Sequence, residues 1–363
     1  MKPRSRSATG RHRVLVVDDS ALVRNVLGAI LGRDRALLVS TAANPLIALR
    51  KMEADRPDVI VLDLEMPEMD GLTFLRKVMS EGPIPIVICS EYASRGSDRA
   101  LRALELGAVG IVNKPHVGLQ DYLLESAVQI TDAVTAAAVA NVKRRSAPAI
   151  NAEPKLSADA VLPSRRKAVA ARPTERVVAI GASTGGTEAL QTILEAMPED
   201  APGIVVVQHM PEGFTKAFAR RLDAGCRIAV KEAETSDEVL RGRALLAPGD
   251  QHMLINRRGA RYFVEIARGP LVSRHRPSVN VLFRSVAQAA GPNGVGVILT
   301  GMGDDGADGL AEMKQAGAAT LAQDKATCVV FGMPKVAIDL GAADHVVGLP
   351  WIPDAILKLT KVP

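Results

Sequence analysis

Cysteine is scarce in this chain, which has only three among its 363 residues. Cys89, Cys226 and Cys328 lie far apart in the sequence, are odd in number and lack the close spacing of metal ligands. This pattern argues against a disulfide framework and against a cysteine-bound metal. It is the pattern expected of isolated thiols in a reducing compartment.

Long hydrophobic runs are also missing. No uninterrupted apolar stretch approaches the roughly 18 residues that a membrane-spanning helix requires. The chain starts with several basic residues and then enters a predicted strand, where a signal peptide would have its apolar core. We therefore expect a soluble, cytoplasmic protein with no membrane insertion.

The basic charge is concentrated in one segment. The whole chain has a formal net charge of +5, yet residues 142–176 alone hold nine basic and three acidic residues, a net charge of +6. The remainder is close to neutral, which favours a basic tether over a nucleic-acid-binding face. Residues 139–174 are rich in Ala, Pro, Ser, Arg and Lys without sustained periodicity, so we predict a flexible linker there.

Alternating strands and amphipathic helices flank this linker on both sides. The hydrophobic content of 47% can fill two cores. Residues 13–138 predict a flavodoxin-like domain of five βα units with strands at 14–17, 37–41, 59–62, 85–89 and 109–112. Residues 175–363 predict a larger, doubly wound α/β domain, mostly parallel, with strands at 177–180, 204–207, 244–247 and 295–299 and an antiparallel addition at 262–266.

Acidic and polar residues follow the predicted strands of the first domain. Asp18 and Asp19 follow the first strand, Asp63 follows the third, and Ser90 and Lys114 follow the fourth and fifth. The carboxyl ends of parallel strands are where a site forms. Three clustered carboxylates either raise each other's pKa or bind a cation, and an all-oxygen set suits Mg²⁺.

A serine among glycines follows the first strand of the second domain. The run Gly181-Ala182-Ser183-Thr184-Gly185 has the G-x-S-x-G form of a nucleophile elbow. Because a glycine-rich loop after a strand can also cradle a phosphate, a nucleotide site is an alternative. That alternative calls for a lysine after the glycines or an acid about 20 residues further on, and neither is convincing here.

Possible partners for this serine also follow apolar strands. His209 can act as the base that takes the proton of Ser183, and Asp305 can orient the imidazole. The chain order Ser, His, Asp disfavours the α/β-hydrolases, in which the acid precedes the histidine. Residue type alone leaves rivals open, namely the histidines His252 and His275 and the acids Asp250, Asp304 and Asp308.

The first domain resembles the receiver domain of two-component response regulators. The resemblance rests on Val16-Val17-Asp18-Asp19-Ser20, on residues 62–71 and on Asn113-Lys114-Pro115. It implies that Asp63 accepts a phosphoryl group from a histidine kinase. It further implies that Mg²⁺ is held by Asp19, Asp63 and the Glu65 backbone carbonyl, with Asp18 assisting, while Ser90 and Lys114 contact the phosphoryl oxygens.

The second domain resembles the chemotaxis protein-glutamate methylesterases, the CheB family. The matching motifs are residues 180–186, 208–214, 247–253, 274–278 and 299–303. The resemblance implies a triad of Ser183, His209 and Asp305, with Thr184 and the Met302 backbone stabilising the oxyanion. It also implies hydrolysis of glutamate γ-methyl esters on chemoreceptors and deamidation of receptor glutamines, under phosphorylation control and without a cofactor for the esterase step.

Two other functions share part of this pattern. A response regulator with a DNA- or protein-binding output would have the same first domain, but DNA recognition needs a basic helix in the second domain, and the excess charge lies in the linker. A small-molecule esterase would have the same triad. We expect a monomer whose partners are chemoreceptors and a histidine kinase, with no nucleic acid.

Overall fold

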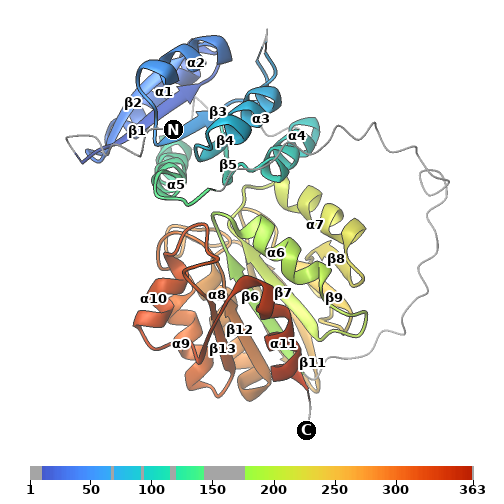
Figure 1. The fold of residues 1–363 in the computed structure, drawn as a ribbon. Coiled ribbons are helices and arrows are strands. Elements are labelled where there is room, and N and C mark those ends of the chain that lie inside the picture. The colour runs from blue at the N-terminus through green and yellow to red at the C-terminus, as the bar shows by residue number, and fades with distance from the viewer. Residues whose placement is uncertain (1–9, 67–68, 91–93, 115–119, 143–175, 362–363) are drawn as a thin grey trace, which may run out of the picture.

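The computed structural model describes residues 10–66, 69–90, 94–114, 120–142 and 176–361, which form two α/β domains stacked on each other (Figure 1). Most of the predicted linker, residues 143–174, lies outside the described residues. Every helix within the described ranges is too short or too polar to span a lipid bilayer.

The first domain has the five βα units that its periodicity predicts. Its parallel sheet has the order β2-β1-β3-β4-β5. The strands are β1 (His12–Val17), β2 (Leu37–Ala42), β3 (Val59–Leu62), β4 (Ile86–Ser90) and β5 (Gly110–Asn113). The helices are α1 (Ala21–Leu31), α2 (Pro45–Ala54), α3 (Gly71–Glu81), α4 (Ser94–Glu105) and α5 (Gln120–Ala138). Helices α1 and α5 cover one face of the sheet, and α2, α3 and α4 cover the other.

The second domain is built on a seven-stranded parallel sheet with the order β14-β13-β12-β6-β7-β9-β8. Its strands are β6 (Val177–Ala182), β7 (Gly203–Gln208), β8 (Ala229–Glu232), β9 (Arg243–Leu246), β12 (Gly294–Ile298), β13 (Ala319–Gln323) and β14 (His345–Val347). An antiparallel hairpin of β10 (His252–Arg258) and β11 (Arg261–Ala267) forms a separate sheet. The sequence did not predict β8, β10, β13 or β14. Strands β8 and β14 are short edge strands with partly exposed side chains, so they lack a continuous apolar run.

Helices cover both faces of the larger sheet (Figure 1). One face packs against α6 (Gly186–Glu195), α7 (Phe214–Gly225) and α11 (Ile352–Thr360). The other packs against α8 (Val279–Ala290), α9 (Ala307–Gln315) and α10 (Met333–Asp339). The domain also contains two short 3₁₀ helices, Gly291–Asn293 and Leu349–Trp351. This is the doubly wound α/β arrangement that the sequence predicts.

The strand order creates a switch point in each sheet. In the larger sheet the chain proceeds from β6 to β7 on one side, whereas β12 lies on the other side of β6. In the smaller sheet the corresponding point lies between β1 and β3. Loops diverge at such a point and leave a crevice at the carboxyl ends of the strands. In the second domain, this brings together the residues that follow β6, β7 and β12. In the first domain, it brings together the residues that follow β1 and β3.

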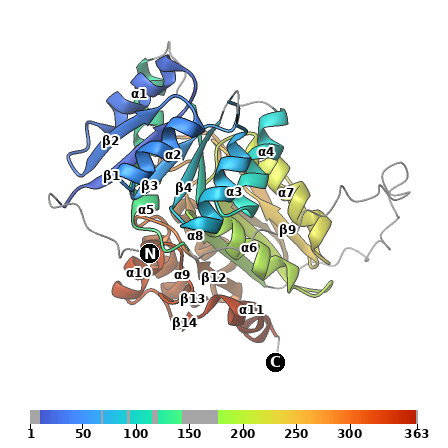
Figure 2. The ribbon, with the colours of Figure 1, turned by 45° about the horizontal axis from the view of Figure 1, so that its top comes forward.

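The first domain sits on the carboxyl-end edge of the larger sheet (Figure 2). Helix α4 lies against α7, and Glu105 forms an ion pair with Arg221 across the boundary. The Gly185 N–H donates to the Val109 carbonyl oxygen at 3.1 Å. Asp132 of α5 lies 3.4 Å from the Arg274 guanidinium. These contacts cover the loop that follows β6 and the segment that precedes α8.

A steric contact links Gly181 to the start of α8. A Cβ added at Gly181 would lie 2.1 Å from Val279 Cγ1, and Val279 is completely buried. We predict that Gly181→Ala lowers the free energy of unfolding by about 1–3 kcal/mol, because overpacking forces neighbouring groups to move. Urea unfolding followed by circular dichroism measures this change.

The double variant Gly181→Ala/Val279→Ala is the matched control. Removing the Val279 methyl groups makes room for the new one, so the two changes should be non-additive by about 1 kcal/mol or more. Strict additivity would contradict the steric explanation.

Candidate active site and acidic site

Ser183 lies in the sharp turn between β6 and α6. Its N–H donates to the Thr300 carbonyl oxygen at 3.0 Å, and its own carbonyl oxygen accepts from the Gly186 N–H at 2.7 Å. Gly185 has a φ of 79°, a left-handed conformation that glycine adopts without steric cost. A Cβ on Gly185 would also lie 2.5 Å from Val329 Cβ. The turn leaves Ser183 just beyond the carboxyl end of β6, as the G-x-S-x-G pattern predicts.

Sheet register places His209 beside Ser183. Ala182 is paired with Gln208 in the β6–β7 ladder, so Ser183 and His209 are the next residues on the two strands. The His209 N–H donates to the Ala182 carbonyl oxygen at 3.0 Å. The buried Gln208 side chain donates through Nε2 to the carbonyl oxygens of Ser183 and His209, at 2.9 and 3.1 Å. Gln208 therefore ties the two loops together, a role that sequence reasoning missed.

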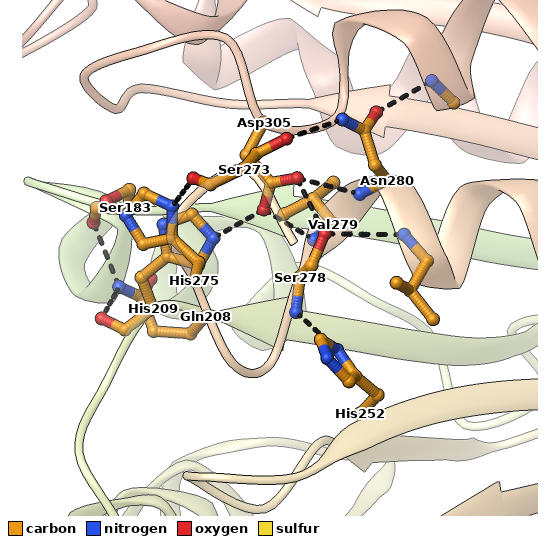
Figure 3. A network of polar contacts seen from close by, with 12 residues as sticks. Ser183, Gln208, His209, His252, Ser273, His275, Ser278, Val279, Asn280 and Asp305 are labelled. Atoms are coloured by element: carbon orange, nitrogen blue, oxygen red, sulfur yellow. Dashed lines mark hydrogen bonds and ion pairs between the residues drawn. The ribbon is translucent and has the colours of Figure 1, made fainter. Parts of the chain in front are cut away.

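The His209 ring contacts Asp305 on one edge and has a free nitrogen on the other (Figure 3). Nε2 lies 2.8 Å from Asp305 Oδ2. Nδ1 is buried, and no hydrogen-bond partner for it is present among the described residues. Since a neutral imidazole that donates from Nε2 has its lone pair on Nδ1, Nδ1 is the nitrogen available to accept a proton.

Asp305 is a fully buried carboxylate at the N-terminus of α8. Oδ1 accepts from the Ser278 hydroxyl at 2.7 Å and from the Asn280 N–H at 3.0 Å, and Oδ2 accepts from the Val279 N–H at 2.7 Å. Burial by itself raises the pKa of Asp305. The hydrogen bond and charge of His209, together with the bonds from Ser278 and Asn280, outweigh burial and lower it.

Ser278 was not predicted as a functional residue. It is the N-cap of α8 and accepts from the Val281 N–H at 3.4 Å while its hydroxyl donates to Asp305. The signal was present in the sequence, because a serine that directly precedes an apolar helical run is a typical N-cap.

The rival acids lie elsewhere. Asp250 is paired with Arg276 at 2.6 Å. Asp304 and Asp308 are exposed, and Asp308 lies in the first turn of α9. The carboxylate that contacts His209 is that of Asp305.

The rival histidines have other partners. His252 Nδ1 accepts from the Ser278 N–H at 3.2 Å, and its Nε2 lies 2.9 Å from the Pro270 carbonyl oxygen, so both of its nitrogens are engaged. His275 stacks on His209, with ring centroids 3.7 Å apart and an interplanar angle of 8°. The nitrogen lone pairs lie in the ring planes, and those planes are nearly parallel. The pair is therefore poorly arranged to share one metal ion, although His209, His275 and Asp305 are close together.

Two backbone N–H groups lie free beside Ser183. Those of Thr184 and Met302 have no acceptor among the described residues, and both residues line the same cavity as Ser183. Thr300 joins their loops, because its hydroxyl donates to the Thr184 carbonyl oxygen at 3.0 Å and accepts from the Val330 N–H at 2.9 Å. Thr184 and Met302 thus line the same cavity as Ser183, and their role in stabilising the oxyanion stays a prediction.

A cavity of about 520 Å³ lies between the two domains. Its lining includes Ser183 and His209 from the second domain and Val109, Ile130 and Asp132 from the first. The first domain thus covers the serine site. The sequence did not predict which residues form this contact between the domains.

The acidic residues of the first domain also converge. Asp18, Asp19 and Asp63 each place a carboxylate oxygen within 4.8 Å of the others. Asp18 and Asp63 are buried, and Asp19 is exposed. Asp18 Oδ2 is buried and accepts no hydrogen bond from any described residue, although Lys114 Nζ lies 3.1 Å away. Three oxygen donors open to solvent on one side fit the ligand preference of Mg²⁺.

Lys114 and Asp63 form an ion pair within this acidic site. Lys114 Nζ lies 2.8 Å from Asp63 Oδ2, and the Glu65 N–H donates to Asp63 Oδ1 at 3.2 Å. Burial raises the pKa of Asp63, and the contact with Lys114 only partly offsets it. Burial would lower the pKa of Lys114, but Asp63 and Asp18 raise it, so the ammonium stays charged. Ser90 is buried at the end of β4, next to β5 and Lys114.

Comparison with known proteins matches both halves of the chain. Residues 14–125 match the response regulator receiver domain model, and residues 178–356 match the CheB methylesterase model. The chain is 60% identical over 350 residues to "Protein-glutamate methylesterase/protein-glutamine glutaminase 5" of Anaeromyxobacter dehalogenans, which covers 96% of this chain and 97% of the relative. It is 57% identical to a protein of the same name, numbered 3, from Geobacter metallireducens, over 96% of this chain and 98% of the relative.

A solved structure agrees with the fold of the second domain. The Thermotoga maritima CheB methylesterase catalytic domain is 41% identical with a TM-score of 0.50, and the match covers 51% of this chain and 99% of that structure. Together, the two folds and sites define a receiver domain joined to a serine-hydrolase-like α/β domain. The chain belongs to the CheB methylesterase family.

The contacts of Asp305 lead to a prediction. In Asp305→Asn, an NH₂ group replaces one carboxylate oxygen. This group is a hydrogen-bond donor, and the groups that surround it are donors too, so the hydrogen bonds are lost and His209 loses its fixed orientation. We predict a loss of ester hydrolysis of about 10²- to 10⁴-fold. The matched control is the neighbouring Asp304→Asn, which should hydrolyse close to the wild-type rate because Asp304 is exposed. Equal losses in the two variants would contradict the assignment.

Proposed function

We propose that this chain hydrolyses glutamate γ-methyl esters on chemoreceptors and deamidates particular receptor glutamines to glutamate, in the adaptation step of chemotaxis. The observation that carries the proposal is the His209–Asp305 pair beside Ser183, covered by a receiver domain. Relatives at 55–60% identity over most of the chain have names that state both activities. The reaction would take place in the cytoplasm, on the receptor helices.

Acylation begins when Ser183 Oγ attacks the ester or amide carbonyl carbon. His209 Nδ1 takes the serine proton, and Asp305 stabilises the resulting imidazolium through Nε2. The carbonyl oxygen becomes an oxyanion that accepts hydrogen bonds from the N–H groups of Thr184 and Met302. The carbonyl reforms as the bond to the leaving group breaks. His209 donates its proton to this group, which departs as methanol or ammonia.

Deacylation repeats these steps with water as the nucleophile. His209 removes a proton from water while the hydroxide attacks the acyl carbon, and the same N–H groups stabilise the second oxyanion. The bond to Ser183 Oγ then breaks, Ser183 recovers its proton from His209, and the product leaves as a glutamate γ-carboxylic acid. This acid then ionises by losing its remaining proton to solvent.

The first domain, residues 13–138, would regulate the catalytic domain, residues 175–363. Asp63 would accept a phosphoryl group from a histidine kinase, with Ser90 and Lys114 contacting the phosphoryl oxygens. Asp19, Asp63 and the Glu65 carbonyl would hold Mg²⁺, with Asp18 assisting. When bound, the ion neutralises phosphoryl charge. Family membership supports this hydrolytic output over a DNA- or protein-binding one.

Methanol release from methylated receptors tests both sites in one experiment. We predict that acetyl phosphate with Mg²⁺ stimulates the wild type, whereas Asp63→Asn keeps the basal rate and shows no stimulation. Ser183→Ala should lose about 10³-fold or more under both conditions, because it lacks the nucleophile. Stimulation of Asp63→Asn at the wild-type level would rule out Asp63 as the phosphorylated residue.

A second prediction concerns how the receiver domain restrains activity. The contact between His209 and Asp305 is already present while the first domain covers the site. A receptor helix of about 10–12 Å diameter cannot enter a cavity of this size, whereas a small ester can. Acetyl phosphate with Mg²⁺ should therefore accelerate receptor demethylation much more than hydrolysis of p-nitrophenyl acetate.

Ser183→Ala gives the background rate for both substrates. Equal acceleration of the two reactions would instead indicate that phosphorylation rearranges the triad itself.

A further inference from the structure

His275 covers one face of the His209 ring. The two rings are stacked at 3.7 Å with an angle of 8° between their planes (Figure 3). Within the part of the chain that the structure describes, the His209 ring makes one hydrogen bond, from Nε2 to Asp305. One bond at one edge lets an imidazole tilt about that edge. A flat ring packed on its face resists the tilt. The stack therefore fixes the direction of Nδ1, the nitrogen that is to accept the serine proton.

The orientation of His275 is itself fixed by its own loop. Nδ1 lies 2.6 Å from the Ser273 carbonyl oxygen. Since a carbonyl oxygen only accepts, Nδ1 must have the proton, and a neutral His275 ring then has its lone pair on Nε2. Ser273 and Arg274 have φ values of 48° and 65°, the left-handed region that non-glycine residues rarely adopt. The loop thus holds an unfavourable backbone conformation that directs this carbonyl toward the ring.

His275 also remains uncharged beside the base. Burial and the neighbouring His209 lower its pKa to about 3, and Arg274 acts in the same direction, while Asp305 and the Ser273 carbonyl act against them. At neutral pH the positive charge formed during acyl transfer therefore lies on His209, which alone of the two contacts Asp305. A neutral aromatic face stabilises a cation placed against it.

We infer that His275 is a positioning residue for the base: its ring face holds His209 with Nδ1 toward Ser183 and stabilises the imidazolium of His209 during acyl transfer. The inference rests on the proposed triad. It assigns no bond-making step to His275, and what it requires of residue 275 is a flat, uncharged ring.

Three substitutions in the full-length protein separate the ring from its nitrogens. His275→Phe keeps a flat neutral ring, His275→Gln keeps polar atoms without a ring, and His275→Ala keeps neither. The readouts are kcat and KM for p-nitrophenyl acetate, the rate at which a fluorophosphonate labels Ser183, and the Tm of each variant.

We expect kcat and labelling rate to fall about 10- to 100-fold in His275→Ala and His275→Gln, the scale of a misoriented catalytic group. KM should change little, and His275→Phe should stay within a few-fold of the wild type. A purely structural defect would instead lower the Tm in step with the activity, so a matched Tm across the variants supports the positioning role.

Two results would overturn the inference. Loss in His275→Phe as large as in His275→Ala would mean that a His275 nitrogen takes part in the chemistry, and wild-type rates in His275→Ala would mean that the stack is incidental. The proposed function can fail separately, because a wild type that labels at Ser183 but releases no methanol from receptors lacks only that substrate. Ester hydrolysis by Ser183→Ala at the wild-type rate would remove the triad and this inference together.

Discussion

A buried carboxylate must accept hydrogen bonds from several donors if it is to remain ionised. The serine site depends on the donors that surround the Asp305 carboxylate. Three donors come from the N-cap and the first two residues of α8, and the fourth is His209. The same helix N-terminus that stabilises the charge thus also fixes the position of the carboxylate. Gly181 lies against Val279 at this helix start, so close packing between β6 and α8 sets the distance from the acid to the serine strand.

Asp305 and Asp63 are buried carboxylates at different switch points, and their pKa values are shifted in opposite directions. Asp305 has four donors, and its pKa is lowered in spite of burial. Asp63 has fewer compensating contacts, chiefly Lys114, and burial raises its pKa. The difference fits the chemistry proposed for each. A carboxylate that orients an imidazolium benefits from permanent charge, whereas a carboxylate that is to be phosphorylated needs an oxygen that strong donors do not fully occupy.

Contact between the domains joins these two sites. Strand β5 and helix α5, which follow the acidic site in the chain, line the cavity over Ser183 and His209. A change at the acidic site that alters this packing would alter access to the serine without altering the triad. The Asp132–Arg274 and Glu105–Arg221 pairs lie at the same boundary. Asp132, Glu105 and Arg221 are half-buried, and Arg274 is exposed.

Sequence alone determined the class of both domains, because apolar periodicity and the residues that end each strand are local properties of the chain. It predicted the parallel strands β1, β3, β6, β7 and β12 and placed Asp63, Ser183 and Asp305 just beyond them. It could not predict the short edge strands β8 and β14, whose pairing depends on neighbours distant in sequence. Residue type could not separate His209 from His252 and His275, or Asp305 from Asp304, although the resemblance of the surrounding motifs implied His209 and Asp305. The contact between His209 and Asp305, the stacking of His275 and the cover formed by the first domain became visible only in the tertiary structure. Strand register and interdomain packing produce these contacts, and both depend on residues that are far apart in the sequence.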